Sequence, residues 1–337
     1  MKKGICFDDV LLVPKYSEIK SRSEIDISSR LSESIKLKLP IISSPMDTVT
    51  EYHMSAVMAD KGGMGIVHRY NTIEEQAKLI PKETLVGAAV GVNGDYLERA
   101  QEMVNAGVKL ICVDVAHGHH SLMRRALWNL KNKLPREIHL MAGNVATSEA
   151  FYDLASWGAD SIKVGIGGGS ICSTRIQTGH GIPTLQSIID CSTASFETGV
   201  KMIADGGIKT SGDIVKSLAA GAGFVMLGSM LAGTRESPGE IIGPNSERPR
   251  KAYRGMASKE AQIDWRGSTS SREGVATEIP YKGSVEPILE DLQVGIRSGF
   301  SYSGASCLTE LQEFSSMLQQ TNASRRESST HILEQGF

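Results

Sequence analysis

One local pattern recurs along most of the chain: a helical segment ends in small residues and glycine, and a short apolar run with a polar end follows. The hinges Asn105-Ala-Gly-Val108, Trp157-Gly-Ala-Asp160 and Ala220-Gly-Ala-Gly223 are examples. Helices that alternate with short buried strands are typical of a parallel α/β sheet. Eight runs are predicted as strands, at residues 40–44, 63–68, 85–91, 108–114, 138–143, 161–165, 201–205 and 223–228. This count predicts an α/β fold of the (β/α)8, or TIM barrel, type, with a doubly wound open sheet as the alternative.

The chain is long enough for one barrel-sized domain, with 337 residues of which 40% are hydrophobic. We expect residues 1–314 to form the barrel and residues 315–337 a polar C-terminal tail. Residues 8–36 are polar with short apolar interruptions, which predicts short antiparallel pieces beside the barrel. Two lysines near the N-terminus are followed by aspartates before any apolar stretch develops. We therefore expect no signal peptide and no membrane span.

The charge balance narrows the choice of partners. The formal net charge is −2 and the sequence pI is near 6.5, which argues against nucleic acid and anionic membranes as partners. The five cysteines form no CxxC pair, which favours a reducing compartment and no structural zinc, so we expect a cytoplasmic protein. His117, His119 and His120 lack the spacing of zinc ligands.

A glycine-rich loop follows the sixth predicted strand, in Val164-Gly-Ile-Gly-Gly-Gly-Ser-Ile-Cys-Ser-Thr-Arg175. Its glycines permit positive φ or close approach of a ligand. Cys172 stands among hydroxyl groups and an arginine, which favour the nucleophilic thiolate. A buried structural cysteine in a tight turn is the alternative, and the loop alone does not decide between the two.

Polar residues also end other predicted strands, and in a TIM barrel the active site lies at these C-terminal ends. Asp114, Asn144 and Asp205 occupy such positions. Gly206-Gly207 and Gly228-Ser229 follow the last two strands, where this fold commonly binds phosphate. The arrangement predicts a small phosphorylated substrate. Helix capping is the better interpretation for Thr147 and Ser211 and remains an alternative for Ser229.

Several motifs, taken together and in order, resemble the family of inosine monophosphate (IMP) dehydrogenases and guanosine monophosphate (GMP) reductases. They extend through about residue 312 and are Phe7-Asp-Asp-Val-Leu-Leu-Val-Pro14, Ser44-Pro-Met-Asp-Thr-Val-Thr50, Gly143-Asn-Val145, the Cys172 loop, Asp205-Gly-Gly-Ile208, Val225-Met-Leu-Gly228, Tyr253-Arg-Gly-Met256 and Pro280-Tyr-Lys-Gly283. The resemblance implies a purine mononucleotide as substrate. It also implies a homotetramer or octamer of barrels.

The resemblance further assigns roles to individual residues. Cys172 would attack C2 of the purine and form a covalent thioimidate. Carbonyl groups of Gly167, Gly169 and Cys172 would bind a monovalent cation such as K⁺. The mononucleotide would be held by Asp205 at the ribose, by Ser170, Gly207, Gly228, Ser229 and Tyr253 at the phosphate, and by the backbone of Gly255 and Met256 at the base. Asp114 and Asn144 would face the nicotinamide.

A predicted mobile flap, at about residues 257–280, bears on the direction of the reaction. Dehydrogenases of the family activate water with an adjacent Arg-Tyr pair on a longer flap, which this segment lacks. Its end, which contains Glu273, resembles the reductases. The link after Arg69 is too short for the regulatory CBS modules that dehydrogenases commonly carry. In the opposite direction, Ala116-His-Gly118 and residues 203–209 resemble dehydrogenases, and Gly168 and Ser173 depart from the usual Pro and Thr of both groups.

These features together predict an NADPH-dependent GMP reductase that converts GMP to IMP and ammonia, with Thr174 and Glu273 supplying the proton for the leaving amine. An IMP dehydrogenase that oxidises IMP to XMP with NAD is the alternative, and Arg266 or Arg272 would then replace the missing base. A non-catalytic nucleotide-binding barrel and a flavin-dependent barrel are less favoured. We expect no flavin and no zinc.

Overall fold

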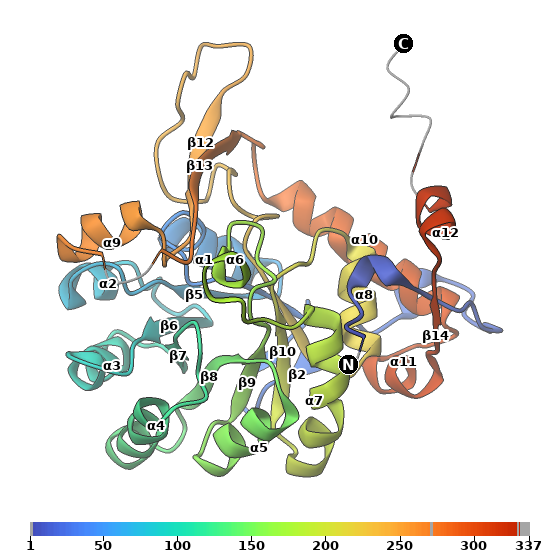
Figure 1. The fold of residues 1–337 in the computed structure, drawn as a ribbon, viewed down its shortest axis with the longest axis horizontal. Helices are drawn as coiled ribbons and strands as arrows, with labels where there is room; N and C mark the ends of the chain where they lie inside the picture. The colour runs from blue at the N-terminus through green and yellow to red at the C-terminus, as the bar shows by residue number, and fades with distance from the viewer. Residues whose placement is uncertain (1–2, 270–271, 329, 331–337) are drawn as a thin grey trace.

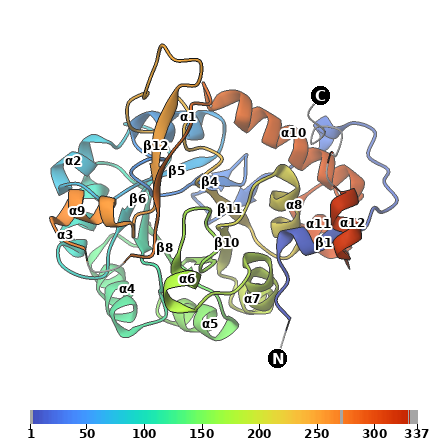
Figure 2. The same ribbon diagram turned by 45° about the horizontal axis from the view of Figure 1, so that its top comes forward.

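The computed structural model describes residues 3–269, 272–328 and 330. Its centre is a closed barrel of parallel strands in the order β10-β11-β4-β5-β6-β7-β8-β9 (Figures 1 and 2). The strands are β4 (Ile41–Ser43), β5 (Met64–Val67), β6 (Val86–Val90), β7 (Leu110–Asp114), β8 (His139–Val145), β9 (Ser161–Val164), β10 (Lys201–Asp205) and β11 (Phe224–Leu227). The predicted (β/α)8 barrel is confirmed, and each strand lies within two residues of its expected bounds. Pairing of β11 with β4 closes the sheet and excludes the open alternative.

Helices surround the barrel, as Figure 2 shows. They are α1 (Tyr52–Asp60), α2 (Ile73–Lys78), α3 (Tyr96–Asn105), α4 (Ser121–Lys133), α5 (Ser148–Ser156), α7 (Thr184–Thr198), α8 (Ser211–Ala219) and α10 (Glu286–Tyr302). Thr147 caps α5 as predicted, whereas the cap of α8 is Thr210 and not Ser211. Ser229 begins no helix, which leaves it available to the loop after β11.

Apolar side chains fill the barrel interior. Leu110, Cys112, Met141 and Phe224 are fully buried there. The same cluster contains Leu31, Ile35 and Leu37 from the segment around the short hairpin of β2 (Ser29–Arg30) and β3 (Lys36–Leu37). Because Leu110 is the first residue of β7, this hairpin closes the N-terminal end of the barrel. The C-terminal end is left for the site.

The two ends of the chain pack against each other. Strand β1 (Val10–Leu12) pairs antiparallel with β14 (Met317–Gln319), and Arg325 of α12 (Asn322–Glu327) forms an ion pair of 2.7 Å with Asp8. Antiparallel pieces beside the barrel were expected from residues 8–36. The segment predicted as a polar tail follows α11 (Leu308–Phe314), and much of it packs against the N-terminal segment through these contacts. Residues 329 and 331–337 lie outside the described part.

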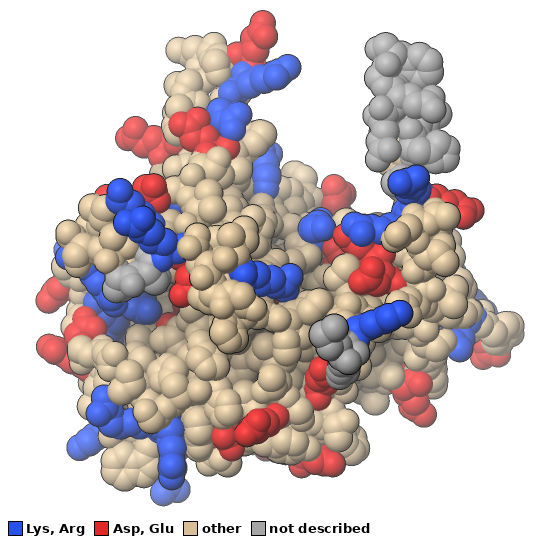
Figure 3. Space-filling model, viewed as in Figure 1, with Lys and Arg blue, Asp and Glu red and all other residues tan. Residues whose placement is uncertain are grey.

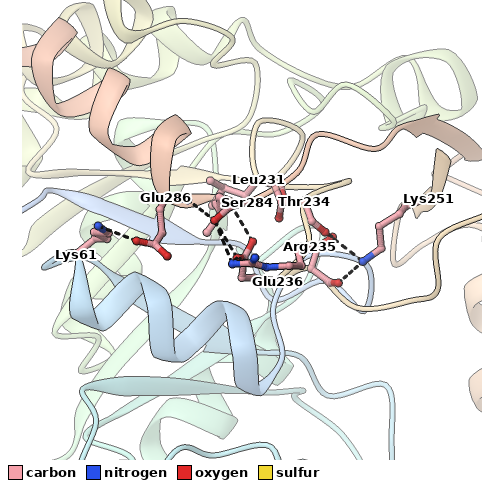
Figure 4. A network of polar contacts seen from close by, with 10 residues as sticks. Lys61, Leu231, Thr234, Arg235, Glu236, Lys251, Ser284 and Glu286 are labelled. Carbon is pink, nitrogen blue, oxygen red and sulfur yellow. Dashed lines mark hydrogen bonds and ion pairs between the residues drawn. The ribbon is translucent and has the colours of Figure 1, made fainter. Parts of the chain in front are cut away.

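An antiparallel arm of β12 (Arg250–Arg254) and β13 (Ala276–Pro280) projects from the C-terminal side of the barrel (Figure 1). Helix α9 (Lys259–Arg266) lies in the segment between the two strands, which is the predicted flap. Figure 4 shows how β12 is fixed: the buried Lys251 donates from Nζ to the carbonyls of Thr234, at 3.1 Å, and Ser237. The anchored strand leads directly to the substrate residues predicted at 253–256.

The surface seen in Figure 3 carries acidic and basic side chains interspersed, without one dominant sign. This distribution agrees with the near-neutral net charge of the sequence. Within the described ranges, no helix is both long enough and apolar enough to cross a membrane.

The buried side chain of His139, at the start of β8, should make the free energy of unfolding depend on pH. Burial lowers the pKa of His139 to about 4, and its Nε2 lies 2.8 Å from the hydroxyl of Ser161. The unfolded chain takes up a proton near pH 6.5, where the folded chain does not, so stability should fall as the pH decreases from about 6.5 to about 4. The loss over this window is about 3 kcal/mol. Urea unfolding at pH 7 and pH 5 should show about 2 kcal/mol of this loss, and His139→Gln should flatten the dependence. Equal slopes for both proteins would contradict the assignment.

Candidate active site

A cavity of about 210 Å³ lies at the C-terminal ends of the barrel strands. The residues predicted for catalysis and mononucleotide binding all line it: Ser170, Cys172, Thr174, Asp205, Gly207, Gly228, Ser229, Tyr253, Gly255, Met256 and Glu273. They come from three strand-end loops, from β12 and from the flap. The structure thus brings together residues that are up to about a hundred positions apart in the chain.

The loop that carries Cys172 owes its path to a glycine after β9. Gly165 has φ of 146°, and a Cβ there would lie 1.9 Å from the carbonyl oxygen of Asp205. No other residue type fits this close crossing of the β9 and β10 ends. The loop then turns into the short helix α6 (Thr174–Thr178), and the Cys172 amide donates to the Gly169 carbonyl at 3.1 Å. Cys172 is consequently half-buried at the cavity, with a free thiol.

Cys172, Thr174 and Glu273 form a continuous chain of polar contacts. The Cys172 thiol donates to Thr174 Oγ1 at 3.1 Å, and the Thr174 hydroxyl donates to Glu273 Oε2 at 2.9 Å. Backbone bonds fix this contact, because Ser173 N donates to the Glu273 carbonyl at 2.9 Å and Val275 N to the Ile171 carbonyl at 3.0 Å. A proton can therefore move between sulfur and carboxylate through one hydroxyl.

The remainder of the smaller cavity offers hydrogen-bonding groups suited to a sugar phosphate. Asp205 ends β10 and accepts a hydrogen bond from Asn144 Nδ2 at 2.9 Å. Gly206 and Gly207 follow it with φ of 94° and 78°, which are conformations that favour glycine. Successive backbone N–H groups in such a turn can bind an anion. Across the cavity the hydroxyls of Ser170 and Tyr253 lie 3.3 Å apart, and burial raises the pKa of Tyr253 so that it stays a neutral donor.

A second cavity, of about 380 Å³, shares Cys172, Thr174 and Asp205 with the first. Asp114 and Asn144, predicted to face the nicotinamide, line this larger cavity. Its walls also hold glycines 165 and 167–169. The thiol therefore stands where two cavities meet, one suited to a mononucleotide and one open to a second reactant.

The flap closes over the larger cavity through contacts that sequence reasoning missed. Trp265 of α9 stacks on Tyr70 with ring centroids 4.2 Å apart, and the Tyr70 hydroxyl donates to the Met256 carbonyl at 2.6 Å. Arg266 also lies over the Trp265 ring, with its Cζ 4.0 Å from the ring centroid. Arg254 bridges from β12 to Asp47, at 2.6 Å, and to Asp264 of the flap. The sequence feature that could have indicated these contacts is Trp265, an aromatic residue in an otherwise polar flap.

Lys163 is the other residue that the sequence analysis overlooked. Its side chain is 2% exposed, and Nζ forms ion pairs with Asp114 and with Asp205, the latter at 3.5 Å. Its signal was a lysine in the middle of an otherwise apolar strand, Ser161–Val164. The histidines near the site have structural contacts: His119 bonds to Asp153 at 2.8 Å, and His120 caps α4.

Comparison with known proteins agrees with this geometry. A family model described as the IMP dehydrogenase / GMP reductase domain matches residues 4–331. The chain belongs to this family. The inosine-5'-monophosphate dehydrogenase of Cryptosporidium parvum is 39% identical over 98% of this chain and 96% of its own length. The GMP reductase of Leishmania major is 32% identical over 98% and 97%. Both names occur among the relatives, which are oxidoreductases of purine metabolism that use NAD(P)H.

A solved IMP dehydrogenase/GMP reductase family member has the same fold. It is a Cys-to-Ala variant of the GMP reductase of Trypanosoma brucei in complex with guanosine 5'-monophosphate, with a TM-score of 0.93, 31% identity and 98% of each chain covered. The Cryptosporidium and Leishmania alignments run over 391 and 480 positions, so both relatives contain segments that this chain lacks. Because a GMP reductase is among the long relatives, the short link after Arg69 does not separate the two activities.

Proposed function

We propose that the protein is a GMP reductase that reduces GMP to IMP and ammonia with NADPH. The contact chain from the Cys172 thiol through Thr174 to Glu273 is the observation that carries the proposal. A flap without an Arg-Tyr pair supports it, because a water-activating base would divert a thioimidate to XMP. The Trypanosoma brucei relative in complex with GMP supports the choice of ligand.

The first step forms the thioether bond to the purine. The Cys172 proton passes to Thr174, and the Thr174 proton passes to the Glu273 carboxylate, so that thiolate and carboxylic acid arise together. The sulfur adds to C2 of GMP across the C2–N3 double bond, and N3 takes up a proton from solvent. Asp205, Tyr253 and the glycine amides hold the ribose and phosphate while the base stays beside the sulfur.

The second step releases ammonia. The bond from C2 to the exocyclic amino nitrogen breaks, and the amino group leaves as ammonia with a proton returned from Glu273 through Thr174. N3 gives its proton back to solvent, which restores the C2–N3 double bond as a thioimidate. When bound, a reduced nicotinamide supplies the hydride that replaces sulfur at C2. Cys172 leaves as thiolate, IMP is released, and solvent returns a proton to the sulfur. One NADPH and one proton are consumed for each GMP.

The larger cavity fits the nicotinamide end of this reaction. It adjoins Cys172, and its wall includes Arg69, whose buried Nε has no hydrogen-bond partner in the described part of the chain. We assign Asp114, Asn144 and Arg69 to holding the dinucleotide. Gly167, Gly169 and Cys172 remain the proposed carbonyl ligands of a monovalent cation such as K⁺, and a homotetramer remains the proposed assembly.

An IMP dehydrogenase is the second candidate, and one observation favours it. Arg266 of the flap lines the larger cavity, so a guanidinium is present in the cavity that also contains Cys172. Its position over the Trp265 ring at 4.0 Å makes it a stacked cation, which argues for a role in holding the flap rather than in accepting a proton.

Absorbance at 340 nm distinguishes the two candidates. Purified protein is given GMP with NADPH and, separately, IMP with NAD and potassium. We expect loss of NADPH with equal amounts of IMP and ammonia. Formation of NADH together with XMP would contradict the reductase assignment, and silence in both assays would favour a binding protein without turnover.

A further inference from the structure

Lys163 occupies a position that is costly for a cation. It lies on β9 between the buried residues Ile162 and Val164, with its side chain 2% exposed. The neighbouring strand leaves room for it, because a Cβ on Gly143 would lie 2.6 Å from the Lys163 Cβ. A buried ammonium group costs several kcal/mol unless it is paired and hydrogen-bonded. Its partners therefore explain why it is present.

Two carboxylates of different strands share this ammonium group. Asp114 at the end of β7 accepts a hydrogen bond from Nζ, and Asp205 at the end of β10 lies 3.5 Å away. Burial alone would lower the pKa of Lys163, but the negative charges of Asp114 and Asp205 raise it above its ordinary value, so the side chain stays protonated. Asp205 lines both cavities, whereas Asp114 lines the larger one.

We propose that Lys163 is a positioning residue that couples the mononucleotide half of the site to the dinucleotide half through its contacts with Asp205 and Asp114. The proposal rests on the proposed function, which assigns those two carboxylates to the two ligands. Ribose hydroxyls that donate to Asp205 satisfy its lone pairs, so the ammonium group can pair more fully with Asp114 and hold that carboxylate in one orientation. Binding of the first ligand thus prepares the site for the second.

The coupling is measurable with a pair of ligands that do not react, GMP and NADP⁺. For the wild-type protein we expect GMP to tighten NADP⁺ binding about tenfold, and NADP⁺ to tighten GMP binding by the same factor. In Lys163→Met this factor should fall to within about twofold of one, as measured by titration calorimetry. Lys131→Met is the matched control, since Lys131 pairs with Asp160 away from the cavities and its loss should leave the factor unchanged.

A second variant keeps the test decisive if Lys163→Met does not fold. Lys163→Met combined with Asp114→Asn removes one charge of each sign, so Asp205 alone loses its ammonium partner, and Asn144 Nδ2 still donates to it. We expect this protein to fold, as judged by circular dichroism and thermal melting, and to show no coupling. A tenfold factor that persists in either folded variant would overturn the proposal.

Failure of the proposed function has a different signature. If GMP does not bind to the wild-type protein, the reductase assignment fails, and the same cycle is then run with IMP and NADH, which do not react in a dehydrogenase. Coupling that disappears with Lys163 in that cycle would still support the positioning role. The positioning role would be overturned if Lys163→Met kept the coupling between IMP and NADH, or if the wild-type protein showed no coupling between them.

Discussion

Cys172→Ala should abolish turnover while GMP still binds. Without the sulfur no thioimidate forms, and we expect kcat to fall at least about 10⁴-fold, because covalent and proton-transfer contributions are lost together. Affinity for GMP should change by less than about threefold, since ribose and phosphate contacts come from other loops. Steady-state kinetics with NADPH and calorimetry with GMP measure the two quantities. Intact-protein mass spectrometry should detect a purine adduct on the parent protein and none on the variant.

The remaining cysteines offer a control for this substitution. Cys307 precedes α11, far in the chain from the loop and not among the residues that line either cavity, and its thiol is also free. Cys307→Ala should retain full turnover and the adduct. Turnover above a tenth of the parent rate in Cys172→Ala would mean that the reaction does not pass through a bond to sulfur.

Glu273→Gln should leave substrate binding nearly intact and slow the chemical step. The amide keeps the size and a hydrogen bond to Thr174 Oγ1 but cannot store the proton taken from Cys172, so we expect kcat to fall about 10²- to 10⁴-fold. Thr174→Val should have a similar effect because it interrupts the same relay. The double variant should be little slower than the slower single variant, since both residues act in series.

A flap glutamate outside the relay provides the comparison. Glu260 lies exposed in the first turn of α9, and Glu260→Gln should keep kcat within about twofold. If Glu273→Gln instead raised the KM for GMP with kcat unchanged, Glu273 would be a binding residue and the proton path would have to be sought elsewhere.

The barrel fold could be predicted from the sequence because each of its repeats has a local sequence pattern. Each strand is a short apolar run ended by polar residues, and hinges such as Asn105-Ala-Gly-Val108 mark the start of the next repeat. Cys172 and Thr174 were likewise found together because they are neighbours in the chain. Glu273 was identified through its place before Pro280-Tyr-Lys-Gly283, and the structure brings it to Thr174.

The contacts that were missed depend on packing between distant segments. Lys163 was hidden because an isolated lysine in a strand does not reveal that two carboxylates from other strands meet above it. The stack of Tyr70 on Trp265 joins the end of β5 to the flap across almost two hundred residues, and nothing in either local sequence specifies the partner. The pairing of β14 with β1 was missed for the same reason.

The base of the relay comes from the flap and not from the barrel. Backbone hydrogen bonds join Glu273 to Ser173 and Val275 to Ile171. The flap segment therefore also supplies the proposed proton acceptor for the Cys172 thiol. In the proposed mechanism, a flap that opens to admit or release a nucleotide would carry Glu273 away from Thr174, and Cys172 would lose its route to a proton acceptor. On the proposed mechanism, the thiol would meet solvent and oxidants only while it lacks a proton acceptor, and it would become a nucleophile only when the flap covers the cavity.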